Sequence, residues 1–133
     1  MPVSVERLEN KPILIATVSD AVDVVAVREM FRQSAELIAE IDERVFRITD
    51  VSKADSNFAE VMGIIREASS TDMPGSTNDP RIQAVFVGNN QWVQMFRSAM
   101  ALKQFGGKTL PMFLTIEDAL EYIEIELGKK QES

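Results

Sequence analysis

Residues 12–51 read PILIATVSDAVDVVAVREMFRQSAELIAEIDERVFRITDV, and this stretch decides the predicted fold. Its first six residues are apolar or β-branched, which is typical of a buried strand. From Val24 to Ile41 the apolar residues recur every three or four positions, as they do on a helix with one buried face. Residues 45–51 return to a strand pattern. This order predicts two parallel strands with a helix packed against them.

The same alternation continues on both sides of this stretch. Residues 3–8 are expected to pair with the first strand across a turn at Asn10-Lys11. Further predicted elements are strands at 82–87 and 111–114 and helices that begin near residues 58, 92 and 116. The sequence therefore predicts the α/β class, with a four- or five-stranded, mostly parallel (mixed) sheet, packed helices and the order βαβαβαβα.

Polar residues and glycines mark the predicted ends of the helices. Either Asp20 or Asp23 is suited to cap the first helix, and Asp55, Ser56 and Asn57 are each suited to cap the second. The last helix is expected to begin after Thr115, with Asp118 at the acidic position of a capping box, and Gly106-Gly107 is expected to close the third helix.

Two loops carry most of the remaining turn-forming residues. Residues 69–80 read SSTDMPGSTNDP, which predicts an exposed and mobile connection inside the domain. Gly88-Asn89-Asn90 lies between a strand and a helix, where backbone N–H groups could hold an anion. A single turn of this kind is a weak indication of a ligand site, and a plain turn is the simpler interpretation.

The 133 residues are too few for two ordinary domains, and 45% hydrophobic with 26% charged residues is typical of a globular chain. We expect one domain over residues 1–128 and a polar C-terminal tail over residues 129–133. The formal net charge of −7 argues against binding of nucleic acid or of an anionic membrane surface, because both require clustered Lys and Arg.

Histidine and cysteine are absent from the sequence. The chain therefore cannot form a Ser-His-Asp triad, a Cys-His pair, a thiolate zinc site or a disulfide. A cysteine-free chain whose first residues lack a basic, then apolar, leader pattern is expected in the cytoplasm. No apolar run is long enough to predict a membrane span, and no cofactor is predicted.

Carboxylates offer the remaining route to catalysis. Asp20, Asp23, Asp50 and Asp55 are predicted near the ends of two central strands, where α/β domains place their ligands. A carboxylate-metal enzyme that uses Asp50 and Asp55 is one interpretation. The competing interpretation is structural: helix caps at Asp20, Asp23 and Asp55, and a strand end at Asp50.

The element order and two short patterns resemble the STAS domain superfamily, especially its anti-sigma-factor-antagonist-like branch. One pattern is Asp50-Val51-Ser52 followed by Asp55-Ser56, which is similar to the Asp-Ser pair that bacterial antagonists present for phosphorylation. The other is FLTIEDALEYI at residues 113–123, which is similar to the closing strand and helix of the branch. The chain departs from the antagonist pattern at Asn57-Phe58, where a small, glycine-containing continuation is expected.

This resemblance implies a non-enzymatic regulatory module that binds an unidentified protein partner around Asp55-Ser56. Its possible phosphorylation or partner-binding residues are Ser56, Asp55 and Asp50. A homo-oligomer is a further possibility. The alternative is a carrier of lipid or another small apolar ligand, similar to CRAL-TRIO domains, with Trp92, Phe96 and Met100 lining its pocket. The simpler interpretation of that stripe is a core-facing side of a helix. The carboxylate-metal enzyme ranks last.

Overall fold

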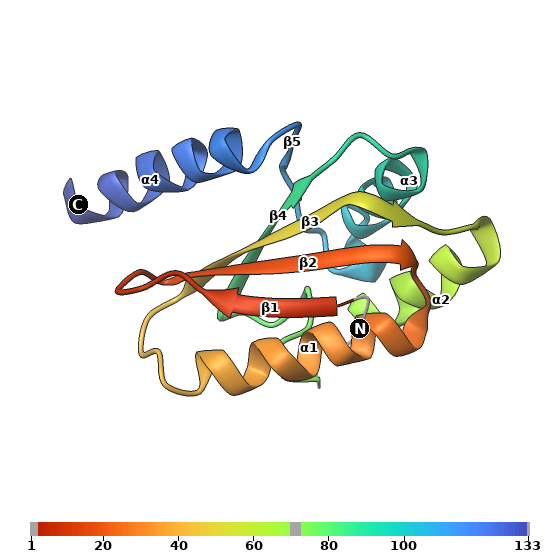
Figure 1. Cartoon of the computed structure of the whole chain (residues 1–133), viewed down its shortest axis with the longest axis horizontal. Helices are drawn as coiled ribbons and strands as arrows, with labels where there is room; N and C mark the ends of the chain where they lie inside the picture. Colours follow the sequence, from red (N-terminus) through yellow and green to blue (C-terminus); the bar gives the residue numbers. More distant parts are fainter. Residues whose placement is uncertain (1–2, 70–72, 133) are drawn as a thin grey trace.

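The computed structural model describes residues 3–69 and 73–132, and the side chains through residue 129. The described elements, in chain order, are β1 (Val3–Arg7), β2 (Ile13–Ala21), α1 (Val24–Ile38), β3 (Val45–Asp55), α2 (Phe58–Ala68), β4 (Ile82–Val87), α3 (Gln91–Met100), a 3₁₀ turn η1 (Lys103–Phe105), β5 (Met112–Phe113) and α4 (Ile116–Glu132). Figure 1 shows their arrangement. The predicted alternation of strands and helices is confirmed.

The strands form one mixed sheet in the order β1-β2-β3-β4-β5. β1 and β2 form an antiparallel hairpin in which Val3 pairs with Val18 and Arg7 with Leu14. The β2–β3, β3–β4 and β4–β5 pairs are parallel. The hairpin can be antiparallel because a short turn suffices to join its strands, whereas each parallel pair needs a helical crossover. The predicted class and strand number are confirmed.

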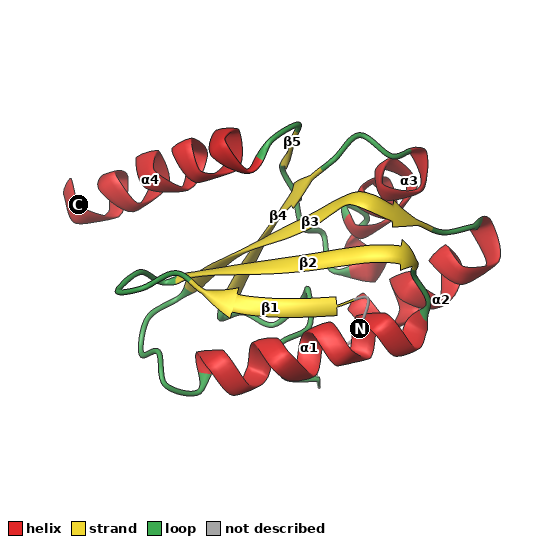
Figure 2. Ribbon diagram, viewed as in Figure 1, coloured by secondary structure: helices red, strands yellow, loops and turns green. Residues whose placement is uncertain are grey.

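Helices cover both faces of the sheet (Figure 2). On one face, side chains of α1, α2 and α3 pack with Ala16, Val51 and Phe86 in the largest cluster of buried residues. On the other face, Ala119 and Ile123 of α4 pack on β3 and β4. Among the described residues, no helix combines the length and the apolar character that crossing a bilayer requires.

The ends of the helices follow the predicted caps in part. Asp23 accepts from the N–H of Ala26 at 2.9 Å and caps α1. Thr115 accepts from the N–H of Asp118 at 3.1 Å in the first turn of α4. α1 ends at Ile38, three residues before the predicted end. α4 continues to Glu132, so the predicted polar tail begins inside this helix.

The predicted role of Gly106-Gly107 is wrong, because α3 already ends at Met100. Leu102 adopts an extended ψ of 141°, which stops the helix, and the carbonyl of Met100 accepts from the N–H of Lys108 at 2.9 Å. Gly106, with φ at 124°, instead closes the 3₁₀ turn.

The prediction of an exposed loop over residues 69–80 is wrong for its second half, and residues 70–72 lie outside the described residues. Ser76, Thr77, Asn78 and Asp79 are all less than 8% exposed. Their burial is possible because side chains in the segment bond to main-chain groups, as when Asn78 donates to the carbonyls of Ser69 and Phe105. The turn-forming residues therefore fold into the interior.

Candidate functional site

β3 carries the predicted aspartates but runs further than the sequence indicated. It continues through Asp55, so Asp50 lies within the strand and does not close it. The Asp50 carboxylate accepts from the N–H of Ser52 at 3.0 Å and from its hydroxyl at 2.7 Å. Asp55 ends the strand, is exposed and accepts from the N–H of Ser56 at 2.9 Å. The two carboxylates therefore have separate local partners.

Ser56 follows β3 directly and lies one residue before the cap of α2. Its half-buried hydroxyl donates to the carbonyl of Val22 at 3.1 Å. The cap of α2 is Asn57, which accepts from the N–H of Glu60 at 3.0 Å. The interpretation of Ser56 as the N-cap is therefore wrong. The reason is that β3 extends to Asp55, so Ser56 lies in the link between β3 and α2. From there its hydroxyl reaches the segment that follows β2.

An open groove of about 650 Å³ begins at this link. Phe58, at the start of α2, is 68% exposed and lines the groove together with Trp92 and Met95 of α3. The lining is completed by residues 55–57 and 90–91. The groove thus lies at the carboxyl edge of the parallel strands, where α/β folds commonly bind ligands.

The helical spacing of Phe58, Val61, Met62 and Ile65 predicts one buried helix face, and the structure corrects this prediction. Val61, Ile64 and Ile65 are buried, whereas Phe58 and Met62 are exposed. The start of α2 lies beyond the sheet edge, where β3 leads into the helix (Figure 1), so its first turn has no strand to pack against. One feature of the sequence could have indicated this exposure: Phe58 is a large aromatic residue directly after the capping residue Asn57.

Asn90 fixes the wall of the groove between β3 and α3. Its side-chain amide donates to the carbonyls of Val51 at 2.9 Å and Ala54 at 2.8 Å. Its side-chain oxygen accepts from the N–H of Asn89 at 3.2 Å, so Asn90 makes no cap bond within α3. The predicted Gly88-Asn89-Asn90 turn therefore serves to anchor α3 to β3.

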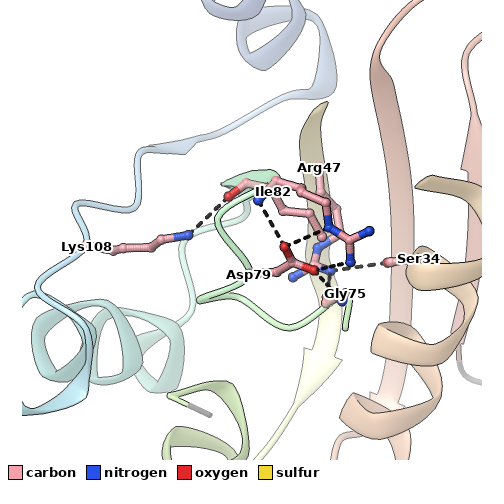
Figure 3. Close-up of polar contacts among 7 residues, drawn as sticks. Ser34, Arg47, Gly75, Asp79, Ile82 and Lys108 are labelled. Carbon is pink, nitrogen blue, oxygen red and sulfur yellow. Dashed lines mark hydrogen bonds and ion pairs between the residues drawn. The ribbon is translucent and has the colours of Figure 1, made fainter. Parts of the chain in front are cut away.

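A second polar cluster lies at the opposite end of β3, inside the fold (Figure 3). Arg47 is fully buried and donates to the hydroxyl of Ser34 at 3.2 Å and to the carbonyl of Gly75. Its guanidinium also lies over the ring of Phe31, 5.4 Å from the ring centroid. Burial lowers the pKa of Arg47 to about 10, an effect that the negative charge of Asp79 opposes.

Asp79, in the segment over residues 73–80, belongs to the same cluster through its bond to the main chain of Gly75. Its carboxylate accepts from the N–H of Gly75 at 2.8 Å and forms an ion pair with Arg81 at 2.7 Å. Burial disfavours the ionised carboxylate, but the hydrogen bonds from Arg81 and Gly75 outweigh it and lower the pKa of Asp79 to about 2. Gly75 has φ at 82°, and a Cβ there would clash with the carbonyl of Phe31. The sequence reasoning missed this cluster.

Lys108 completes the cluster from the loop after η1. Its ammonium donates to the carbonyls of Thr77 at 2.6 Å and Ile82 at 3.1 Å. Burial lowers the pKa of Lys108 to about 8, and the neighbouring charges of Arg44 and Arg47 act in the same direction. The cluster holds a short segment against the sheet, and its charged groups bond within the chain.

Neither the groove with its neighbouring aspartates nor the buried cluster around Arg47 provides a metal site. Among residues 3–69 and 73–132, no three acidic side chains come together in a way that could hold an ion. Asp20, which adopts φ at 62°, lies in β2 one residue before its end and pairs with Ala54, whereas Asp23 caps α1. The cap interpretation is therefore confirmed for Asp23 and wrong for Asp20, because β2 runs on to Ala21 and holds Asp20 in the strand.

The mixed five-stranded sheet, with three helices on one face and one on the other, has a SpoIIAA-like fold. A solved structure with this fold is that of an uncharacterised DUF3478-family protein from Shewanella loihica PV-4. It aligns with a TM-score of 0.58 over 90% of each chain, at 11% identity. No family model matches the chain, and no curated protein does. The likeness confirms the predicted fold.

Proposed function

We propose that this chain is a non-enzymatic regulatory module that binds a protein partner in the groove between the first turns of α2 and α3. The observation that carries the proposal is Phe58, which is 68% exposed beside Trp92 and Met95. Exposed aromatic side chains that border a groove are frequent anchors of protein interfaces. Burial of one such ring by a partner contributes about 2 kcal/mol to binding.

The rigid surroundings of the groove support this proposal. Asn57 caps α2, and Asn90 ties α3 to β3, so both walls are held by side-chain bonds to the main chain. A groove held in this way loses little conformational freedom on binding. Asp55 and Ser56 line the same groove, so a change of charge at either residue alters the surface that the partner contacts.

The other candidate functions have less support. A lipid carrier needs a large interior space, and the cavity that the described residues enclose beneath α1, α2 and α3 measures about 40 Å³. Benzene alone occupies engineered cavities of about 150 Å³. For the carboxylate-metal enzyme, Asp50 and Asp55 bond to Ser52 and Ser56 and form no group of three ligands with other described side chains.

The experiment compares two charge-introducing variants in a pull-down from cells of the source organism. Phe58→Asp places a charge in the groove. Leu114→Asp does so at a similarly exposed apolar residue, 70% exposed, in the link between β5 and α4. We expect a partner that wild type and Leu114→Asp recover equally and that Phe58→Asp loses at least tenfold. Recovery of every partner by Phe58→Asp at the wild-type level would overturn the proposal.

A further inference from the structure

α4 carries a second line of side chains on the side that faces away from the sheet (Figure 2). Leu120 and Ile123 belong to the apolar cluster that packs α4 on the sheet. At about 100° per residue, positions spaced four, three and four residues apart lie within about 60° of each other, on the other side of the helix. These residues, here called the outer stripe, are Asp118, Tyr122, Ile125 and Lys129.

The middle of the outer stripe is apolar. Ile125 is 54% exposed, and Tyr122 is half-buried. The ring of Tyr122 contacts the ring of Phe113, with 5.3 Å between the two ring centroids. Because this contact holds the ring, Tyr122 loses little conformational freedom when another surface covers it. The two side chains therefore form a small apolar surface that is ready for contact.

Opposite charges lie at the two ends of the outer stripe. Asp118 is exposed and lies one helical turn before Tyr122, and Lys129 lies one turn after Ile125. The ammonium of Lys129 is 3.3 Å from the Glu126 carboxylate, and its side chain is 67% exposed, so it can donate to a further acceptor. An antiparallel second α4 would place Lys129 opposite Asp118, whereas a parallel one would place like charges together. The outer stripe is therefore complementary to its own reversed copy.

We propose that the outer stripe binds a second copy of this chain, with the two α4 helices antiparallel about a twofold axis. Each Tyr122 lies against Ile125 of the other copy, and each Asp118 forms an ion pair with Lys129 of the other copy. The 17 residues of α4 span about 25 Å, which gives a small interface, and the net charge of −7 on each chain opposes association. The dimer is therefore weak and reversible.

Sedimentation velocity of the isolated chain tests the dimer over a range of about 10 to 500 µM. We expect a reversible shift toward the dimer as the concentration rises. Ile125→Asp should weaken the dimer about tenfold or more, because it places a charge in the apolar middle of the interface. Leu102→Asp is the matched control. Leu102 is 52% exposed but lies directly after α3, so this variant should dimerise like wild type.

An exchange of charges tests the antiparallel direction. Asp118→Lys and Lys129→Asp each bring two pairs of like charges together in the dimer, so each should weaken it about 3- to 10-fold. The double variant restores opposite charges and should dimerise within about twofold of wild type. The proposal is overturned if wild type stays monomeric over the whole range, if Ile125→Asp dimerises like wild type, or if the double variant dimerises no better than the single variants. α2 and α3 lie on the other face of the sheet, so these results are independent of the docking proposal.

Discussion

Ser56 holds its hydroxyl against the main chain of the segment that follows β2, where it donates to the carbonyl of Val22 at 3.1 Å. A phosphate on this oxygen can no longer donate that bond, and it adds about −1.5 to −2 charges next to Asp55. The first turn of α2 begins two residues later, and its partial positive charge offsets part of this repulsion. Modification of Ser56 would therefore trade a local hydrogen bond for a strongly altered groove surface.

Two substitutions at Ser56 separate these effects. Ser56→Ala removes the bond to Val22 and should lower the free energy of unfolding by about 1 kcal/mol in urea titrations, with partner binding retained. Ser56→Asp adds a negative charge to the groove and should weaken binding of the recovered partner, measured by quantitative pull-down. Equal binding by Ser56→Asp and wild type would remove Ser56 from the proposed regulatory role.

Lys108 makes the stability of the fold depend on pH. Its pKa is lowered from 10.5 to about 8 in the folded chain. Between these two values the unfolded chain binds more protons at Lys108 than the folded chain, so the free energy of unfolding rises with pH across this window. After allowance for solvent screening of a half-buried group, the rise is on the order of 1 kcal/mol.

Lys108→Met should abolish this rise between pH 8 and 10.5, as measured by urea unfolding at several pH values. The matched variant Lys53→Met changes an exposed lysine on β3 and should keep the wild-type slope. If wild type and Lys108→Met show the same slope, the ammonium of Lys108 is not destabilised by burial.

Among the secondary-structure elements, α2 depends on a single cap. Asn57 satisfies the N–H of Glu60, and no other side chain among the described residues is seen to do so. Asn57→Ala should lower the free energy of unfolding by about 1 kcal/mol, whereas Asn57→Asp should preserve most of it, because aspartate caps equally well. Thermal and urea unfolding of both variants test this. An equal loss in both would assign the effect to a contact other than the cap.

β1 is an edge strand, and α1 supplies part of its protection. The N–H of Val5 donates to the side-chain oxygen of Gln33 at 3.0 Å, which occupies a main-chain donor that another strand could otherwise use. Gln33→Leu should leave this donor unpaired and increase self-association, measured by sedimentation velocity. Gln33→Glu retains an acceptor and should behave as wild type. Unchanged association of Gln33→Leu across a wide concentration range would show that the edge is protected by other means.

For the molecule as a whole, the fold could be predicted because each strand and helix carries its own pattern. The apolar spacing of α1 and the apolar and β-branched run of β2 each point to one secondary structure and one buried face. The choice of helix cap could not be predicted, because Asp55, Ser56 and Asn57 are all suited to cap α2. The length of β3 decides between them, and parallel pairing with β2 carries this strand to Asp55.

The buried cluster could not be predicted for a different reason. Arg47 lies in an alternating strand pattern that does not show which polar residue points inward. Its acceptor, the carbonyl of Gly75, is 28 residues further along the chain in a segment that reads as a surface turn. The groove could not be predicted either, because the exposure of Phe58 depends on where the strands end. The first turn of α2 lies beyond that point, so no strand covers Phe58.

The position of Arg47 also sets an order of events during synthesis. β1, β2, α1, β3 and α2 are all complete by residue 68, and they include Ser34, which accepts one bond from Arg47. The carbonyl of Gly75 and the negative charge of Asp79 follow only later in the chain. A nascent chain that has emerged only as far as α2 therefore carries a cation at the centre of its sheet without the groups that neutralise it there. Such a half-made chain cannot settle into its final packing. We therefore expect the N-terminal half to complete its packing only after residues 75–79 have emerged, so that the domain folds as one cooperative unit.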